Sequence, residues 1–169
     1  MYRYGITPPV TPVFEELESL SPNITPGRNE RLGVVFHHSI FPFEETIAYM
    51  SKRENIVSYH CLIDTDGTRC QLALDDTIAH HAGVSVFKGR EGCNRFMLGC
   101  AFAGDTYQEP LTEPQLESAL EWLEPRWKRY QWSVEWMTDH RTVAPDRKDD
   151  LNPEEWARVL SAIKGRFGA

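Results

Sequence analysis

Residues 32–39 read LGVVFHHS, a compact apolar run that ends in two histidines and a serine. An uninterrupted apolar run of this length is typical of a strand that is buried on both faces of a sheet. Because the side chains of a strand alternate between its two faces, His37 and His38 cannot point the same way. We therefore predict a central strand whose C-terminal end brings one histidine to a pocket and leaves the other a structural role.

Strand and helix patterns alternate on either side of this run. Residues 56–64 (IVSYHCLID) and residues 69–74 flank the pair Asp66-Gly67, which is a strong signal for a β-hairpin. Further strands are expected at residues 96–104 and 134–137, and helices at residues 43–53, from residue 112 and from residue 153. Because strands and helices interleave, the predicted fold class is α/β, a single domain with a central mixed β-sheet flanked by helices.

Two of these helices carry signals for their ends. Pro125 lies inside the apolar helical pattern that starts at Thr112, so it is expected to kink or restart that helix. The last helix has Asn152 as its N-cap, Pro153 at its first position and a glutamate where a capping box needs one. We therefore expect the final helix to begin at Pro153.

The chain has 169 residues, which suits one domain with a sizeable core. Its formal net charge of −7 argues against a general affinity for nucleic acid. The sequence has no apolar window long enough to span a membrane and no apolar stretch typical of a signal peptide at its N-terminus. We expect a cytoplasmic monomer without nucleic-acid or membrane partners.

The four cysteines, at positions 61, 70, 93 and 100, lie within or beside apolar runs and show no CxxC spacing. Two disulfides could form from this number, but a domain with a normal core does not need them. We predict buried free thiols, which favours a reducing compartment.

Residues 1–31 are rich in proline, asparagine and serine. Phe14, Leu17 and Leu20 recur on one side of a helical pattern there, so a short surface helix is expected over residues 13–20, flanked by extended linker. The prediction therefore divides the chain into an N-terminal extension with a short helix, residues 1–31, and a main domain, residues 32–169.

Residues 139–150 read DHRTVAPDRKDD and combine metal-ligand chemistry with a turn. His140 can offer a neutral imidazole nitrogen to zinc, and Asp150 can offer a carboxylate oxygen after the chain turns back at Pro145. Lys148 could then face a substrate carbonyl held at the same metal. The alternative is a charged, solvated loop with a turn at residues 144–145. Because catalytic zinc usually has three protein ligands, the third has to come from elsewhere in the chain.

Four motifs occur in the order found in one enzyme family. They are the strand-end His37, the pair Tyr59-His60, residues 80–83 (HHAG) and residues 139–150. With these motifs, residues 32–156 resemble the type 2 N-acetylmuramoyl-L-alanine amidase family, which includes phage lysozyme amidases and peptidoglycan recognition proteins. Residues 58–64, 81–85 and 144–148 are most similar to the AmpD-like branch, which recycles anhydro-muropeptides.

This resemblance implies the fold of that family and a zinc amidase domain. The family's metal ligands fall on His37, His140 and Asp150, and its catalytic lysine falls on Lys148. The last ligand is a cysteine in other branches, so the aspartate agrees with the AmpD-like pattern. Tyr59 stands where phage amidases and catalytic recognition proteins have a functional tyrosine, although a tyrosine on a hairpin can equally be an aromatic residue at the edge of the core.

The histidines outside the ligand set have different expected roles. The resemblance implies that His81 lines the pocket and contacts the substrate. The others, His38, His60 and His80, are interpreted as structural.

The implied reaction is hydrolysis of the amide between N-acetylmuramic acid, or its 1,6-anhydro form, and L-alanine. One departure concerns residues 98–101 (LGCA), where Ala101 replaces the glutamate proposed as a catalytic base in the AmpD-like branch. The alternative is a recognition module that binds peptidoglycan without cutting it, but the complete set of candidate ligands favours the enzyme. The sequence leaves open whether the substrate is a soluble muropeptide or intact peptidoglycan.

Overall fold

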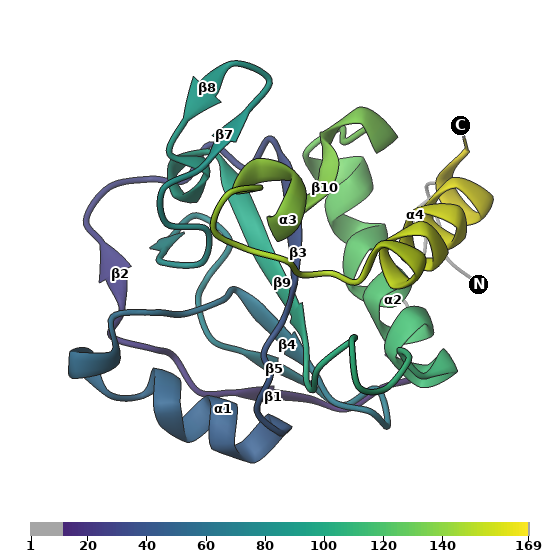
Figure 1. The fold of residues 1–169 in the computed structure, drawn as a ribbon, viewed down its shortest axis with the longest axis horizontal. Coiled ribbons are helices and arrows are strands. Elements are labelled where there is room, and N and C mark those ends of the chain that lie inside the picture. Colours follow the sequence, from purple (N-terminus) through teal and green to yellow (C-terminus); the bar gives the residue numbers. More distant parts are fainter. Residues whose placement is uncertain (1–11, 169) are drawn as a thin grey trace, which may run out of the picture.

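The computed structural model describes residues 12–168, and a six-stranded mixed sheet lies at its centre (Figure 1). The two long strands, β3 (Gly33–His38) and β9 (Met97–Phe102), are buried along their whole length. The shorter strands are β1 (Glu16–Glu18), β4 (Cys61–Ile63), β5 (Arg69–Gln71) and β10 (Met137–Asp139). Their order across the sheet is β1-β5-β4-β9-β3-β10. The predicted single α/β domain with a central mixed sheet is therefore confirmed.

The directions of the strands explain where side chains with chemistry gather. β4, β9, β3 and β10 run parallel, β5 runs antiparallel to β4, and β1 runs parallel to β5. The register places His37 of β3 opposite Ala101 of β9, and Asp139 of β10 opposite Phe36 of β3. The carboxyl ends of four parallel strands thus meet at one edge of the sheet, which is where open α/β sheets commonly bind ligands.

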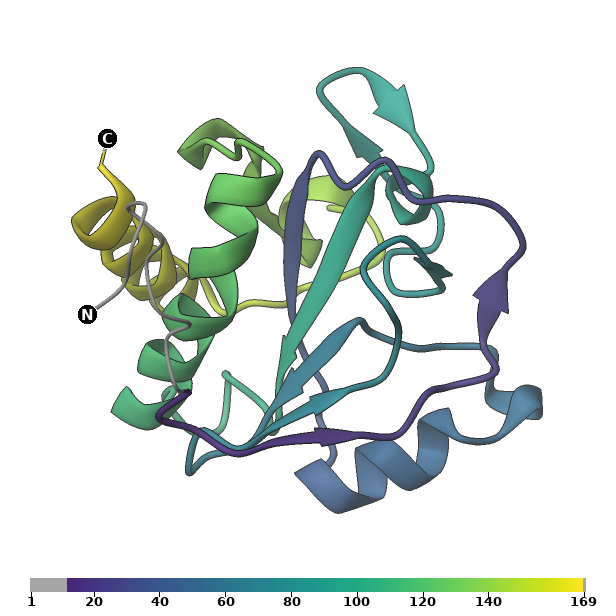
Figure 2. The ribbon, with the colours of Figure 1, turned by 180° about the vertical axis from the view of Figure 1, so that it is seen from behind.

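Helices cover both faces of the sheet. α2 (Glu113–Arg129) and α4 (Pro153–Phe167) pack together on one face, and α1 (Phe43–Met50) lies on the other, as the view from behind shows (Figure 2). The alternation along β3 follows these layers, since Val34 and Phe36 join the core beneath α2 and α4 whereas Val35 belongs to a cluster on the opposite face. The buried run at residues 32–39 therefore forms the middle layer of the molecule.

Short elements connect these layers. They are the paired strands β2 (Ile24–Thr25) and β6 (Ile78–Ala79), the paired strands β7 (Val86–Phe87) and β8 (Arg90–Glu91), the helix α3 (His140–Val143), and the 3-10 helices η2 (Arg53–Asn55), η3 (Cys93–Arg95) and η4 (Val134–Trp136). Within residues 12–168, no helix is both long enough and apolar enough to cross a bilayer.

The helix expected over residues 13–20 is wrong. Residues 16–18 form β1 instead, which extends the sheet by pairing in parallel with β5. The unpaired backbone groups at the edge of β5 offer hydrogen bonds that a surface helix of about two turns could not replace. Residues 1–11 of the predicted extension lie outside the described part of the chain.

The strand expected at residues 134–137 begins later than predicted. Val134–Trp136 form η4, and only Met137–Asp139 pair with β3. The Trp136 carbonyl oxygen lies so close to Gly33 that a Cβ at that glycine would be 2.0 Å from it. The chain therefore turns tightly beside the start of β3 before it runs extended, and a side chain at position 33 would block the approach.

The helix ends also differ in part from the prediction. α4 begins at Pro153 as expected, and the Asn152 side chain accepts the backbone N–H of Glu154. Glu155 does not complete a capping box, because its carboxylate instead accepts the backbone N–H of Leu111. A complete capping box occurs at α2, between Thr112 and Gln115. Pro125 does not restart α2, which continues to Arg129.

The four cysteines are free and buried, as predicted. Cys61 and Cys100 lie in the core beneath α2 and α4, and Cys70 lies in the cluster beneath α1. Cys93 belongs to a third cluster with Phe96 and Val143. Each of the three apolar clusters formed by residues 12–168 therefore contains at least one thiol.

Arg69 connects the N-terminal strand to the rest of the fold. Its side chain is 3% exposed and forms ion pairs with Glu16 of β1 at 2.9 Å and with Glu121 of α2 at 3.1 Å. The guanidinium also donates to the carbonyl and the hydroxyl of Ser118. Three elements thus converge on one buried cation.

We expect Arg69→Ala to lower the free energy of unfolding by roughly 3 kcal/mol, because removing one member of a buried charge network leaves its partners uncompensated. Urea unfolding of the variant measures the loss. The control is Arg166→Ala, whose ion pair with Glu124 is 39% and 47% exposed, so its effect should stay below about 1 kcal/mol. Equal losses in the two variants would contradict this interpretation of Arg69.

Candidate metal and catalytic site

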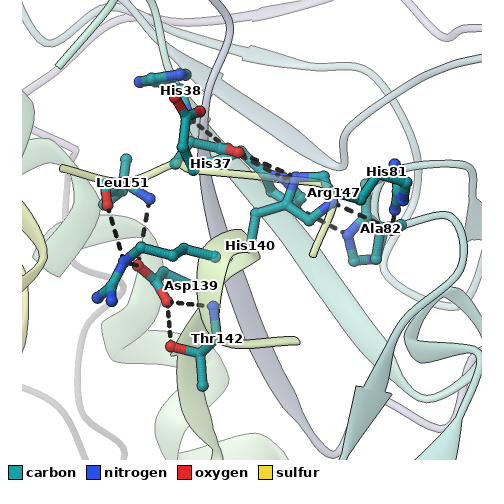
Figure 3. Close-up of polar contacts among 12 residues, drawn as sticks. His37, His38, His81, Ala82, Asp139, His140, Thr142, Arg147 and Leu151 are labelled. Carbon is teal, nitrogen blue, oxygen red and sulfur yellow. Dashed lines mark hydrogen bonds and ion pairs between the residues drawn. The ribbon is translucent and has the colours of Figure 1, made fainter. Parts of the chain in front are cut away.

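Three potential metal ligands meet at the carboxyl ends of β3 and β10. His37 is near the end of β3, His140 follows β10 directly, and Asp150 lies in the segment that leads to α4. All three residues are buried, and each offers one ligand atom to a common point. The two histidines lie side by side in the site although 103 residues separate them (Figure 3). The structure therefore brings together the three residues that the resemblance marked as ligands.

The spacing of the two histidine nitrogens and the Asp150 carboxylate oxygens is compatible with a zinc ion. Nδ1 of His37 lies 3.0 Å from Nδ1 of His140 and 3.7 Å from Oδ2 of Asp150, and Nδ1 of His140 lies 3.3 Å from Oδ1 of Asp150. Zinc bonds of about 2.0–2.1 Å in a tetrahedron place neighbouring donor atoms about 3.3 Å apart. The observed distances scatter around that value, and two nitrogens with one carboxylate are a ligand set that zinc accepts.

Electrostatics keep these ligands in the form that binds a metal. Burial lowers the pKa of His37 well below its ordinary value, and the neighbouring His140 and His81 lower it further. Burial alone would raise the pKa of Asp150, but the neighbouring His140 and the backbone N–H of His38 hold that pKa below its ordinary value. These shifts hold His37 neutral and Asp150 ionised, the forms in which the two side chains bind a metal.

A cleft of about 410 Å³ opens beside the ligands. One wall consists of charged residues of the loop at 147–150, among them Lys148, whose side chain is exposed. Other residues of its lining are apolar and partly exposed, among them Phe41, Tyr49 and Ile56. The cleft can therefore hold a substrate that has both an apolar and a charged part.

Tyr59 lies between this cleft and the core. Its ring centroid is 5.1 Å from that of His37, and its hydroxyl lies 3.5 Å from the carbonyl oxygen of His38. Burial raises the pKa of Tyr59 far above its ordinary value, and the negative charge of Asp150 raises it further. Tyr59 is therefore a neutral phenol that can donate a hydrogen bond beside the ligand cluster.

The remaining histidines differ in position. His38 points to the other face of the sheet, as alternation requires, and its Nδ1 lies 2.8 Å from Oγ1 of Thr106. His81 borders the cleft, but it is 6% exposed and Nδ1 of its ring lies 3.0 Å from Nε2 of His37. His60 bonds the backbone of Thr77 and Gly99. His81 therefore contacts a candidate ligand directly, whereas His38 and His60 hold the scaffold.

Ala101 leaves the face of β9 next to His37 without a carboxylate. The two residues are directly opposite in the register and share a face of the sheet, and Ala101 is fully buried in the cluster against which Tyr59 packs. Among the described residues, the carboxylates that line the cleft are those of Asp149 and Asp150. A proton acceptor for the reaction therefore cannot be the residue at position 101.

Asp139 is a site residue that the sequence analysis quoted but gave no role. Its carboxylate is fully buried and accepts the backbone N–H of Thr142 at 3.0 Å and that of Leu151 at 3.2 Å (Figure 3). It thereby fixes the start of α3, which bears His140, against the segment that bears Asp150. Aspartate is a common N-cap residue, and that preference could have identified half of this role.

Acid is expected to destabilise the metal-free protein. Burial lowers the pKa of His60 to about 4, whereas an unfolded histidine titrates near 6.5. As the pH falls from about 6.5 to 4, His60 therefore binds a proton in the unfolded chain but stays neutral in the folded protein. This single group should cost roughly 2 kcal/mol of stability between pH 7 and pH 5, and the buried His37 and His81 act in the same direction.

Urea unfolding at pH 7 and pH 5, in the presence of a chelator, measures this loss. In His60→Gln the donor to the Thr77 carbonyl is kept but the titrating ring is removed, so the difference between the two pH values should shrink. An unchanged difference in the variant would show that His60 is not one of the responsible groups.

Comparison with known proteins supports the resemblance seen in the motifs. A family profile described as N-acetylmuramoyl-L-alanine amidase matches residues 28–153. The 1,6-anhydro-N-acetylmuramyl-L-alanine amidase AmpD of Enterobacter cloacae is 36% identical over 123 residues, which are 72% of this chain and 63% of that protein. The AmpD of Escherichia coli K12 is 38% identical over 118 residues, 69% of this chain and 61% of that protein. The chain thus spans less than two thirds of the length of these relatives.

A solved structure gives the same result for the fold. The crystal structure of a selenomethionine derivative of AmpD superposes with a TM-score of 0.74 at 27% identity, and the match covers 88% of this chain and 94% of that one. Since the family profile extends over most of the sequence and includes all three clustered ligands, the chain belongs to the N-acetylmuramoyl-L-alanine amidase family.

Proposed function

We propose that this protein is a zinc-dependent amidase that hydrolyses the amide between the lactyl group of N-acetylmuramic acid, or its 1,6-anhydro form, and L-alanine. The observation that carries the proposal is the close approach of the donor atoms of His37, His140 and Asp150 beside the cleft. The relatives named as 1,6-anhydro-N-acetylmuramyl-L-alanine amidases support this choice of bond.

The bound metal and the residues of the cleft would each supply part of the chemistry. When bound, zinc supplies Lewis acidity, which makes water a nucleophile near neutral pH and polarises a carbonyl. Lys148, at the charged wall, would stabilise the negative charge that develops on the carbonyl oxygen. Tyr59 would donate a second hydrogen bond to that oxygen, since its phenol stays protonated. Water adds to the carbonyl carbon, the C–N bond breaks, and the products are a lactyl carboxylate and the free amine of L-alanine.

The substrate that we propose is a soluble muropeptide with the 1,6-anhydro sugar, because the relatives are named for that form. Intact peptidoglycan is the competing substrate. We further propose that the protein acts as a cytoplasmic monomer, with no nucleic-acid or membrane partner.

A second candidate function follows from one observation. Position 101, beside His37, holds an alanine instead of the glutamate of the AmpD-like branch. A cleft without that carboxylate could bind muropeptides without cutting them. This alternative is a peptidoglycan-recognition module that retains the complete ligand set.

Mass spectrometry of products separates these possibilities. The protein is incubated with soluble anhydro-muropeptides and, separately, with purified sacculi, each with and without a zinc chelator. Release of free peptide beginning at L-alanine that the chelator prevents would establish the amidase, and the preferred substrate would distinguish recycling from wall lysis. No release from either substrate, by protein shown to contain zinc, would favour the recognition module.

A further inference from the structure

The loop that follows β6 contacts both histidine ligands from behind. Nε2 of His37 lies 3.0 Å from Nδ1 of His81, and Nε2 of His140 lies 3.1 Å from the carbonyl oxygen of Ala82. Two successive residues of one loop therefore contact the outward-facing nitrogens of both rings, and Figure 3 shows these four residues together.

These hydrogen bonds fix which nitrogen of each ligand carries the proton. The Ala82 carbonyl can only accept, so Nε2 of His140 donates, and in the neutral ring Nδ1 then keeps its lone pair. On the other side, Nε2 of His81 lies 3.0 Å from the carbonyl of Met97, which also can only accept. Nε2 of His81 is therefore the protonated nitrogen and its Nδ1 is an acceptor. It follows that Nε2 of His37 donates to His81, and Nδ1 of His37 keeps its lone pair.

The loop is held rigidly enough to impose this pattern. Oδ1 of Asn94 accepts the backbone N–H groups of His81 at 3.1 Å and Ala82 at 2.7 Å. The ring of His81 lies against the backbone of β9 at Gly99, where a Cβ would be only 2.5 Å from Cγ of His81. The guanidinium of Arg147 also donates to the Ala82 carbonyl, at 2.6 Å. The loop is thus fixed by the amide of Asn94, by close packing against Gly99 and by the guanidinium of Arg147.

We propose that His81 and Ala82 are positioning residues that set the tautomers of both histidine ligands before zinc binds. The proposal rests on the zinc site proposed above and goes further, because it assigns His81 to the metal rather than to the substrate. Because the Nδ1 lone pairs of both histidines already face the metal position, no proton has to move and no ring has to rotate when zinc binds. Outer partners of metal-bound histidines act in this way, and their loss typically weakens metal affinity about 10- to 100-fold.

Substitutions at His81 test the proposal with a matched pair. In His81→Asn the amide oxygen can occupy the position of Nδ1 and still accept from His37. In His81→Gln the amide nitrogen can reach the Met97 carbonyl, as Nε2 does, but no acceptor faces His37. We expect zinc affinity, measured by competition with a chromophoric chelator, to fall about 10- to 100-fold in His81→Gln and to stay within a few-fold of the wild type in His81→Asn.

The Michaelis constant distinguishes a positioning role from substrate contact. At saturating zinc, KM for anhydro-muropeptide should be unchanged in both variants. Unchanged zinc affinity with a raised KM would overturn the proposal and return His81 to the substrate.

A measurement on the unmodified protein removes any dependence on how the variants fold. Two-dimensional 1H–15N NMR of the metal-free protein at pH 7.5 reports imidazole tautomers through long-range couplings. His37 and His140 should both appear as the Nε2–H form, and an Nδ1–H form of either would overturn the proposal. If the protein bound no zinc at all, the proposed function would fail, whereas the tautomers would still decide whether the ligands are preset.

Discussion

Asp150→Ala is expected to abolish zinc binding and amidase activity together. The carboxylate is the negative member of the ligand cluster, and its oxygens lie 3.3 and 3.7 Å from the ligand nitrogens of His140 and His37. Without it, two neutral imidazoles remain, fewer than the three protein ligands that catalytic zinc usually needs. The loss of zinc affinity should therefore exceed the roughly 10- to 100-fold typical of changes outside the ligand set. Metal analysis of the purified variant and an assay of peptide release measure the two effects.

The neighbouring carboxylate supplies the control. Asp149 also lies near Asp150 and His38, and these three could form a different metal cluster. However, Nδ1 of His38 already accepts the backbone N–H of Thr106 at 3.1 Å. Asp149→Ala should therefore retain zinc. Loss of zinc in Asp149→Ala with retention in Asp150→Ala would move the metal to the other cluster.

Lys148→Ala is expected to retain zinc and to lower kcat by about 10² to 10³, the range typical of removing one donor to a developing oxyanion. Lys148 lines the cleft and its positive charge reaches His37, whose pKa it helps to lower, but it is not one of the clustered ligands. Zinc content and steady-state kinetics of the same preparation separate the two functions. Full activity in Lys148→Ala would show that the oxyanion role is wrong, and loss of zinc would show that its role is structural.

Arg147→Ala is a useful comparison for that experiment. Arg147 is the adjacent cation on the same loop, but its guanidinium is bonded to the carbonyls of Ala82 and Val84. We expect its removal to disturb the loop behind the ligands, and hence zinc affinity, more than the chemical step. Arg147→Ala should therefore lower zinc affinity more than kcat, whereas Lys148→Ala should lower kcat and retain zinc.

Local pattern was sufficient to predict much of this molecule. The central strand at residues 33–38 follows from an apolar run, and the opposite directions of His37 and His38 follow from the alternation of side chains. The ligand cluster depended on more than local pattern, because the three residues come together only through the register of β3 and β10. Their assignment as ligands came from the order of motifs along the chain and stays a prediction, whereas the family itself is shown by the profile that matches residues 28–153.

The errors concern contacts between distant residues. Residues 16–18 fit a helical pattern, but they form β1 because β5 and the buried Arg69 are available to pair with them. The position of Asp139 at the end of β10 gives no sign that its second oxygen would bind Leu151, twelve residues later. In the same way, the sequence shows that His81 is a histidine but not which atom its ring faces.

The four buried thiols lie in three different apolar clusters, so their reaction with a reagent can report local opening of each cluster. Because a thiol reacts with an alkylating reagent only when it is exposed as thiolate, a buried cysteine is labelled only while its surroundings are open. Cys61 and Cys100 report on the core beneath α2 and α4, and Cys70 reports on the cluster beneath α1. Cys93 reports on the cluster that includes Ala82. Peptide mapping after timed alkylation would therefore give a separate labelling rate for each cluster, and a comparison with and without metal would show how far the ligand cluster restrains the regions around it.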